Sequence, residues 1–205
     1  MIKKKILILA EGYEEKPYIE KLIHFPCVSE SYCFAPVINL KGNGQIFSRY
    51  QYEFQTGKYD LVLVFADADR GSKQFIEIIE KIGKELFGDQ SKGKLVFMFV
   101  NPVTMQIILS HFAKIDLTHK SKKLNADLIK ELTEIENYDA KNEQIKELIG
   151  KVNYKNYPIM KENIKELSTD YMIVPSTNIL AFLENFESDD VSWIDEINNQ
   201  ITTIS

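Results

Sequence analysis

Three acidic residues follow two apolar, strand-like segments of this chain. The segment ILILA runs directly into Glu11 and Gly12, and the segment LVLVFA runs into Asp67, Ala68 and Asp69. In an open α/β sheet, ligands bind beyond the carboxyl ends of the strands, where the strand order reverses. If the two strands are neighbours, Glu11, Asp67 and Asp69 converge on one small volume.

Carboxylates gathered in this way favour a cation. Like charges at close range are costly unless one group takes up a proton or a cation neutralises them. Mg²⁺ is the simplest ion for a site made only of oxygen ligands. We expect Asp67 and Asp69 to be metal ligands, because residues i and i+2 at a strand end can approach the same ion. Glu11, alone on the other strand, is the candidate general acid or base. The pattern predicts metal-dependent phosphoryl transfer.

Composition narrows the class of protein. The 205 residues allow one domain with a substantial extension or two small domains, and the apolar content of 44% suits a packed core. The net charge of −5 argues against a generally basic surface, although a local basic patch remains compatible with it. The two cysteines have no metal-ligand spacing, which indicates a reducing cytoplasm. We expect no signal peptide and no membrane span, since every apolar segment is too short.

The first half of the chain alternates strands and helices. The second strand contains Pro36, which places it near a sheet edge. Asn101 and Pro102 are a suitable N-cap and first residue for the last helix of this half. The alternation predicts an α/β fold with a mostly parallel, four-stranded sheet and right-handed crossovers. We expect strands over 4–10, 33–39, 60–66 and 94–100, and helices over 14–24, up to about Gly57, over 72–87 and from Asn101 to Phe112.

The second half changes character at about residue 119. Strand patterns disappear, except over Tyr171–Val174, and amphipathic helical segments take their place. We therefore expect an α/β domain over 1–118 and a helical extension over 119–205 that packs on it. Trp193 should be partly buried, because it lies on the same helical stripe as Ile197. The expected helices cover about 124–136, 140–150, 158–167, 177–186 and 190–201.

Residues 1–115 resemble the Toprim (topoisomerase–primase) family, and within it the OLD-nuclease and RloB-like proteins. The strings that carry the resemblance are ILILAEGYEEKPYIEKL, YDLVLVFADADR and NPVTMQIILSHF. The Toprim pattern is Glu-Gly after the first strand and Asp-x-Asp after a later one, here Glu11-Gly12 and Asp67/Asp69. OLD-type members add an acidic residue four positions after the first, which falls on Glu15.

The RloB-like pattern adds Asn101-Pro102 before a helix and His111-Phe112 near its end. Proteins of this type usually carry a Glu about four residues after that Asn, whereas this chain has Met105 followed by Gln106. The site could then bind one metal ion instead of two, take its missing carboxylate from elsewhere, or have lost activity.

The resemblance implies a Mg²⁺- or Mn²⁺-dependent nuclease that cleaves phosphodiester bonds in DNA or RNA, of the kind that serves in phage defence. Its metal site would comprise Glu11, Glu15, Asp67 and Asp69. A separate ATPase of the ABC/SMC type is the expected partner, because the chain has no GxxxxGK[ST] loop of its own, and a homodimer stays open. The alternative is a catalytically degenerate Toprim module that binds nucleic acid or a partner protein.

Simpler interpretations exist for each acidic motif. Glu11-Gly12 could be an ordinary strand-to-helix turn, with Glu14 and Glu15 interacting favourably with the helix dipole. Asp67 and Asp69 could be loop residues, with Asp69 capping the next helix.

The candidate substrate contacts also have simpler interpretations. They are Asn101, His111 and the lysines of a basic cluster beside His119. Asn101 can orient water or phosphate, whereas His111 could instead be a hydrogen-bonded partner of an apolar helix face. The cluster is either a solvated loop or a contact for phosphates; its lysines are Lys120, Lys122 and Lys123.

Overall fold

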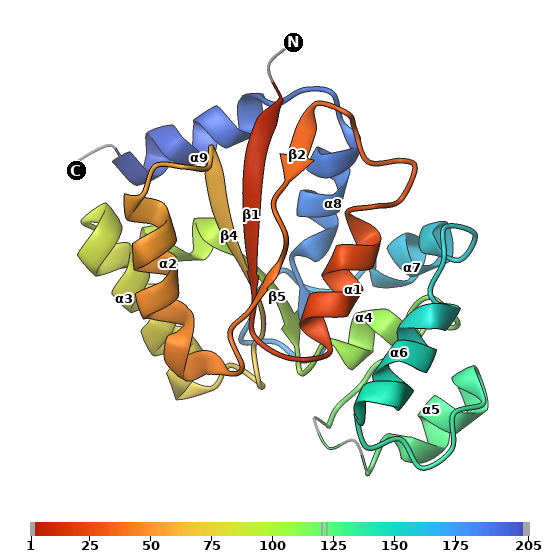
Figure 1. The fold of residues 1–205 in the computed structure, drawn as a ribbon. Helices are drawn as coiled ribbons and strands as arrows, with labels where there is room; N and C mark the ends of the chain where they lie inside the picture. The colour runs from red at the N-terminus through yellow and green to blue at the C-terminus, as the bar shows by residue number, and fades with distance from the viewer. Residues whose placement is uncertain (1–2, 120, 122, 203–205) are drawn as a thin grey trace.

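The computed structural model describes residues 3–119, 121 and 123–202. Within them, six strands form one sheet with the order β2-β1-β4-β5-β6, and β3 also pairs with β1 (Figure 1). The first five strands run parallel, and β6 is antiparallel to β5. The strands are β1 (Lys4–Ala10), β2 (Tyr32–Phe34), β3 (Ile38–Asn39), β4 (Leu61–Asp67), β5 (Phe97–Asn101) and β6 (Ser176–Thr177).

Helices cover both faces of the sheet. In Figure 1, α2 and α3 lie against one face, and α1 and α8 lie against the other. The central strands are buried along almost their whole length, which explains their continuous apolar sequences. The helices are α1 (Glu15–Leu22), α2 (Ile46–Gln55), α3 (Lys73–Phe87), α4 (Met105–Leu109), α5 (Ala126–Thr133), α6 (Asn142–Lys151), α7 (Tyr157–Ile164), α8 (Ile179–Glu187) and α9 (Ser192–Thr202), with 3₁₀ turns η1 (Asn43–Gln45) and η2 (Gln90–Val96).

The strand order reverses between β1 and β4. From β1 the chain first moves outward to β2 and β3, and it then returns to add β4 and β5 on the other side of β1. The β1–β4 pair is therefore the switch point at which ligands bind in open α/β sheets. Its carboxyl end is the lower end of the sheet in Figure 1, where β1 leads into α1.

The structure confirms the α/β class, the mostly parallel sheet and the C-terminal helices that the sequence predicts. The expected second strand is present as two short strands, because Pro36 and its neighbours interrupt the pairing with β1. The helix expected from Asn101 is wrong in its start. Asn101 ends β5, Thr104 is the N-cap, and α4 covers only Met105–Leu109.

The second half contributes more than helices. The expected strand at Tyr171–Val174 is wrong, because these residues form turns, and the nearby β6 pairs with β5 instead. Thr177 Oγ1 donates to Phe99 O at 2.6 Å, which holds β6 against the sheet. Trp193 is buried as expected, and its Nε1 donates to the Tyr32 hydroxyl at 2.9 Å.

The five expected C-terminal helices correspond to α5–α9, and each is somewhat shorter than expected. Helix α9 crosses the amino end of the sheet, where Lys4 pairs with Asp195 at 2.7 Å and Asn198 Nδ2 donates to Asp60 O at 2.9 Å. Over the part of the chain that is described, no helix combines the length and apolar character that crossing a bilayer requires.

Candidate functional site

Glu11 and Asp67 meet at the switch point. Ala10 pairs with Phe65 in the parallel ladder of β1 and β4, and Glu11 N extends this ladder by donating to Phe65 O at 2.9 Å. Asp67 N then donates to the Glu11 carboxylate at 3.0 Å. The condition set by the sequence, that the two strands are neighbours, is therefore met, and the two acidic residues are in contact.

The turn after β1 adds two further carboxylates. Helix α1 begins at Glu15, so Glu14 and Glu15 follow Gly12 within one turn of chain. A Cβ atom at Gly12 would lie 2.5 Å from Glu15 Oε2, so a side chain there would displace the Glu15 carboxylate. Glu15 is only 5% exposed. Glu14 accepts a hydrogen bond from the Tyr138 hydroxyl at 2.6 Å, which ties this turn to the segment between α5 and α6.

Asp67 is held from the opposite side by Thr104. The backbone N and the Oγ1 of Thr104 donate to Asp67 Oδ1 at 2.6 and 2.7 Å. Burial, together with the negative charges of Glu15 and Glu11, raises the pKa of Asp67 well above its ordinary value, although the Thr104 bonds partly offset this. The structure thus concentrates negative charge at this point, and a cation would relieve the repulsion.

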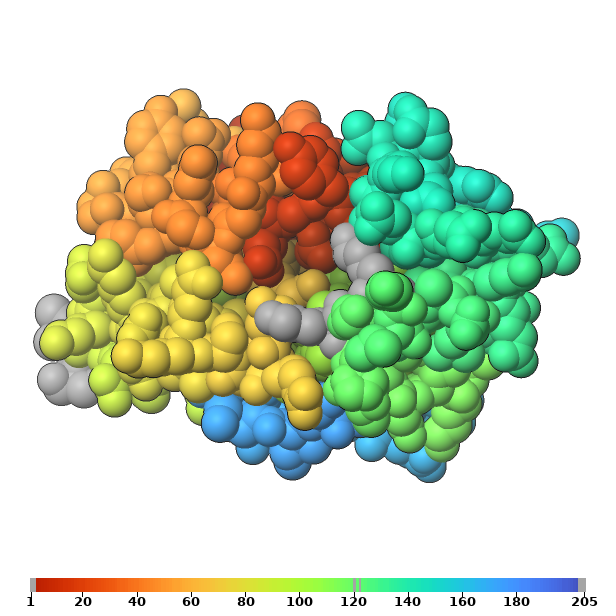
Figure 2. All heavy atoms as spheres, turned by 90° about the horizontal axis from the view of Figure 1, so that it is seen from below, coloured from red at the N-terminus to blue at the C-terminus, as the bar shows by residue number. Residues whose placement is uncertain are grey.

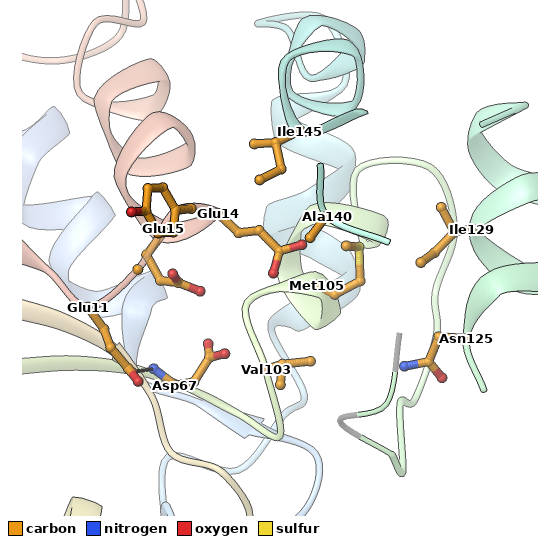
Figure 3. A pocket seen from close by; sticks show the side chains of 12 residues that line it. Glu11, Glu14, Glu15, Asp67, Val103, Met105, Asn125, Ile129, Ala140 and Ile145 are labelled. Carbon is orange, nitrogen blue, oxygen red and sulfur yellow. Dashed lines mark hydrogen bonds between the residues drawn. The ribbon is translucent and has the colours of Figure 1, made fainter. Parts of the chain in front are cut away.

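The carboxylates line a pocket of about 280 Å³. In Figure 3, the acidic side chains lie on one side of the pocket, and apolar side chains face them from the other. Figure 2 looks onto the carboxyl end of the sheet and shows a hollow where the N-terminal segment meets the region of α5 and α6. The lining residues are Glu11, Gly12, Tyr13, Glu14, Glu15, Asp67, Val103, Met105, Asn125, Ile129, Ala140 and Ile145.

The donor set suits Mg²⁺ or Mn²⁺, because it consists of carboxylate oxygens. In the described part of the chain, no group of three or more His, Cys, Asp or Glu side chains is yet arranged as a metal cage. Side-chain rotation of Glu11 and Glu15 would be needed to bring their oxygens and those of Asp67 onto one ion. The residues that would hold it are these three, with Glu14 beside them.

Asp69 lies in the loop between β4 and α3 and does not line the pocket. Its φ is +50°, and the next residue, Arg70, also has a positive φ of +67°. The alternative that Asp69 caps the following helix is wrong, because the N-cap of α3 is Ser72, whose side chain accepts from Phe75 N. The role of Asp69 as a metal ligand stays a prediction.

Asn101 holds three backbone segments together. Its Oδ1 accepts from Arg70 N at 2.8 Å, and its Nδ2 donates to Tyr171 O and Ile173 O at 2.8 and 2.7 Å. Asn101 is completely buried and is not part of the pocket lining. The structure therefore assigns it the positioning of the loop after β4, and a direct substrate contact would require these bonds to break.

His111 lies in the interior beside α1 and α7. Its ring nitrogens contact the Tyr18 hydroxyl at 3.1 Å and Asn156 Oδ1 at 2.9 Å. Burial lowers the pKa of His111 to about 4, so the ring is neutral at physiological pH. This agrees with the simpler interpretation of His111 as a hydrogen-bonded partner of an apolar face, and the pocket lining does not include it.

Of the basic cluster, Lys123 and His119 are exposed, whereas Lys120 and Lys122 lie outside the described residues. Asn125 follows the cluster, lines the pocket and donates from Nδ2 to His119 O at 2.9 Å. The loop that carries Lys123 is thus anchored next to the pocket.

Sequence patterns did not identify the residues from α5, α6 and the segment between them as part of the site. Their apolar side chains look like ordinary core positions, and only the fold brings them opposite Glu11. Met105 is different, since its departure from the family pattern pointed to this position, and it does line the pocket.

No protein-family model, curated protein sequence or solved structure matches this chain. The Toprim resemblance therefore remains a prediction from the motifs.

Proposed function

We propose that this protein is a divalent-metal-dependent nuclease that hydrolyses phosphodiester bonds in DNA or RNA. The observation that carries the proposal is the meeting of Glu11 and Asp67, with Glu15 beside them, at the switch point between β1 and β4. These carboxylates come from the ends of two strands and from the first turn of a helix. The fold therefore brings them together, and they are not simply neighbours in the sequence. The order of the acidic motifs also resembles that of Toprim nucleases.

Each acidic residue has a distinct part in the proposed reaction. Asp67, fixed by Thr104, and the buried Glu15 would hold Mg²⁺ or Mn²⁺. Such an ion supplies charge neutralisation at the scissile phosphate and lowers the pKa of a bound water. Glu11 accepts or donates a proton at the attacking or leaving oxygen. Asp69 would join the site only if its loop rearranges.

The biological setting is part of the proposal. Toprim proteins of the OLD and RloB-like type suggest phage defence with a separate ATPase partner of the ABC/SMC type, and the exposed faces of α5–α9 are candidates for contact with it. Lys123 is exposed next to the pocket and is a candidate for phosphate contact.

A non-catalytic nucleic-acid- or protein-binding module is the second candidate. Met105 lines the pocket where the proteins that the motifs resemble carry an acid. This observation favours a site that has lost its chemistry while keeping its shape.

A cleavage assay separates the two. Wild type, Glu11→Gln, Asp67→Asn and Asp60→Asn are incubated with single- and double-stranded DNA and RNA and Mn²⁺, with and without an ATPase partner. Asp60 is the matched control, because it precedes the same strand, β4, at its opposite end.

We expect cleavage by wild type and Asp60→Asn, and a loss on the order of 100-fold or more in the other two variants. Cleavage that persists in both would come from another site. No cleavage in any condition, with metal still bound, would favour the non-catalytic module.

A further inference from the structure

The pocket beside the carboxylates has an unusual second wall. Opposite the acidic side chains, Figure 3 shows a group of apolar side chains. They come from α4, α5, α6 and the segments that precede α4 and α6. Val103 and Ala140 keep part of their surface exposed to the pocket. By contrast, Ile129 of α5, Ile145 of α6 and Met105 of α4 are almost completely removed from solvent. An apolar wall does not help to bind a metal ion or a phosphate, because both interact with polar groups.

The wall also lacks the groups that would bind phosphate. Among the described residues that line the pocket, none is Lys or Arg, so nothing there neutralises a phosphate charge directly. Whatever occupies this side must offer an apolar face to Val103 and Ala140 while remaining attached to a group at the acidic wall. A nucleobase attached through its sugar to the scissile phosphate has this combination.

The size of the pocket fits one base. Its volume of about 280 Å³ is close to the lower end of the range of small-ligand sites, roughly 300–1,000 Å³. A single heterocycle suits a pocket of this size.

An aromatic side chain completes this environment. Tyr13 lines the pocket and is 58% exposed. It follows directly after Glu11 and Gly12, so its ring lies close to the carboxylates. Exposed aromatic rings beside a nucleic-acid site stack on unpaired bases with little sequence preference, because every base has a π face. Paired bases in a duplex are already stacked and cannot present that face without being extruded.

We propose that the pocket takes one unpaired nucleobase of a single-stranded substrate, with the partly exposed side chains of Val103 and Ala140 and the ring of Tyr13 as its contacts. This inference rests on the proposed nuclease function and names its substrate class. A duplex would be cut only where a base is unpaired or flipped out.

The binding test uses single-stranded and duplex oligonucleotides of identical sequence that carry one 2-aminopurine, a base whose fluorescence changes when its stacking partners change. Ca²⁺ replaces Mn²⁺, and the full chain is titrated in. We expect a saturable change in fluorescence with the single strand and none with the duplex. Val103→Thr and Tyr13→Ala should each weaken single-strand binding about fivefold or more.

Two control variants separate pocket contacts from general damage. Val191→Thr alters a partly buried valine just before α9 that does not line the pocket, and Tyr52→Ala removes a tyrosine of 57% exposure on α2. Both should bind as wild type does. Equal losses in Val103→Thr and Val191→Thr, or in Tyr13→Ala and Tyr52→Ala, would overturn the assignment.

The same oligonucleotides with Mn²⁺ distinguish this inference from the nuclease proposal. Metal-dependent cleavage of duplex as fast as single strand would overturn the unpaired-base pocket and leave the nuclease intact. A fluorescence response without cleavage would support the pocket and count against catalysis. The absence of any single-strand preference in both assays would overturn the inference.

Discussion

Asp67 combines features that stability alone would not select. It accepts two short hydrogen bonds from Thr104, while Glu11 and Glu15 place negative charge beside it. Repulsion between these carboxylates lowers the stability of the fold, and functional sites commonly carry such a cost in stability. Glu14 also contributes negative charge to this region, but one of its carboxylate oxygens accepts a hydrogen bond from the Tyr138 hydroxyl.

Met105→Glu tests the missing acid directly. Met105 is 4% exposed and lines the acidic pocket, so a fifth carboxylate there should lower the metal-free stability by about 2–4 kcal/mol. Added Mn²⁺ should recover more stability in this variant than in wild type, because the ion neutralises one more charge. Urea unfolding with EDTA or Mn²⁺ measures both effects. Met105→Gln, similar in size and uncharged, is the control. A Mn²⁺ response no larger than that of wild type would show that position 105 does not reach the ion.

His111 gives a pH dependence with a defined sign. Its pKa is about 4 in the native protein and about 6.5 when unfolded. Between these values the unfolded state binds more protons, so the free energy of unfolding falls as the pH is lowered through this window. The wild type should lose about 2 kcal/mol from this group between pH 7.5 and pH 5.

Urea unfolding at the two pH values measures this loss. His111→Gln should show a smaller difference between them, whereas the exposed His119→Gln should behave as wild type does. An identical pH dependence in all three proteins would mean that His111 is not buried as a neutral ring.

At the scale of elements, the strand order explains why distant motifs meet. β1 and β4 are separated by α1, β2, β3 and α2 in sequence, yet they pair directly, and the chain reverses direction across the sheet between them. Alternating strands and helices predicted the parallel sheet, and strand-end carboxylates predicted where the site would lie. Pro36 marked the second strand as irregular and is where it breaks. The short α4 was not predictable, because its bounds depend on which backbone groups find partners in the assembled fold.

Asn101 joins three of these elements, and its removal should be costly. Asn101→Leu would leave Arg70 N, Tyr171 O and Ile173 O without the side chain that satisfies them. We expect the free energy of unfolding to fall by about 2–4 kcal/mol. Asn163→Leu, which removes one side-chain bond to Ser110 O, should cost less and is the comparison in urea unfolding. Equal losses would indicate that Asn101 does not hold the loops together.

At the scale of the whole molecule, both halves of the sequence contribute residues to the pocket beside the carboxylates. The acidic wall comes from residues 11–15 and Asp67, and the facing wall comes largely from α4, α5 and α6. The sequence predicted the first wall, since carboxylates at strand ends are recognisable. It could not predict the second, because Ile129 and Ile145 have the same spacing as core residues of any amphipathic helix. Their role depends on where the C-terminal helices pack.

The central claim is that carboxylates from β1, α1 and β4 form a divalent-metal site. Thermal unfolding of wild type, Asp67→Asn and Asp60→Asn across a Mn²⁺ titration tests it most directly. At a Mn²⁺ concentration of 100 times Kd, binding to the native state adds about 2.7 kcal/mol to the free energy of unfolding. This raises the midpoint of thermal unfolding by about 5 to 10 °C for a chain of this size. We predict this rise in wild type and Asp60→Asn and its loss in Asp67→Asn. No rise in wild type at millimolar Mn²⁺, or an equal rise in Asp67→Asn, would contradict the account.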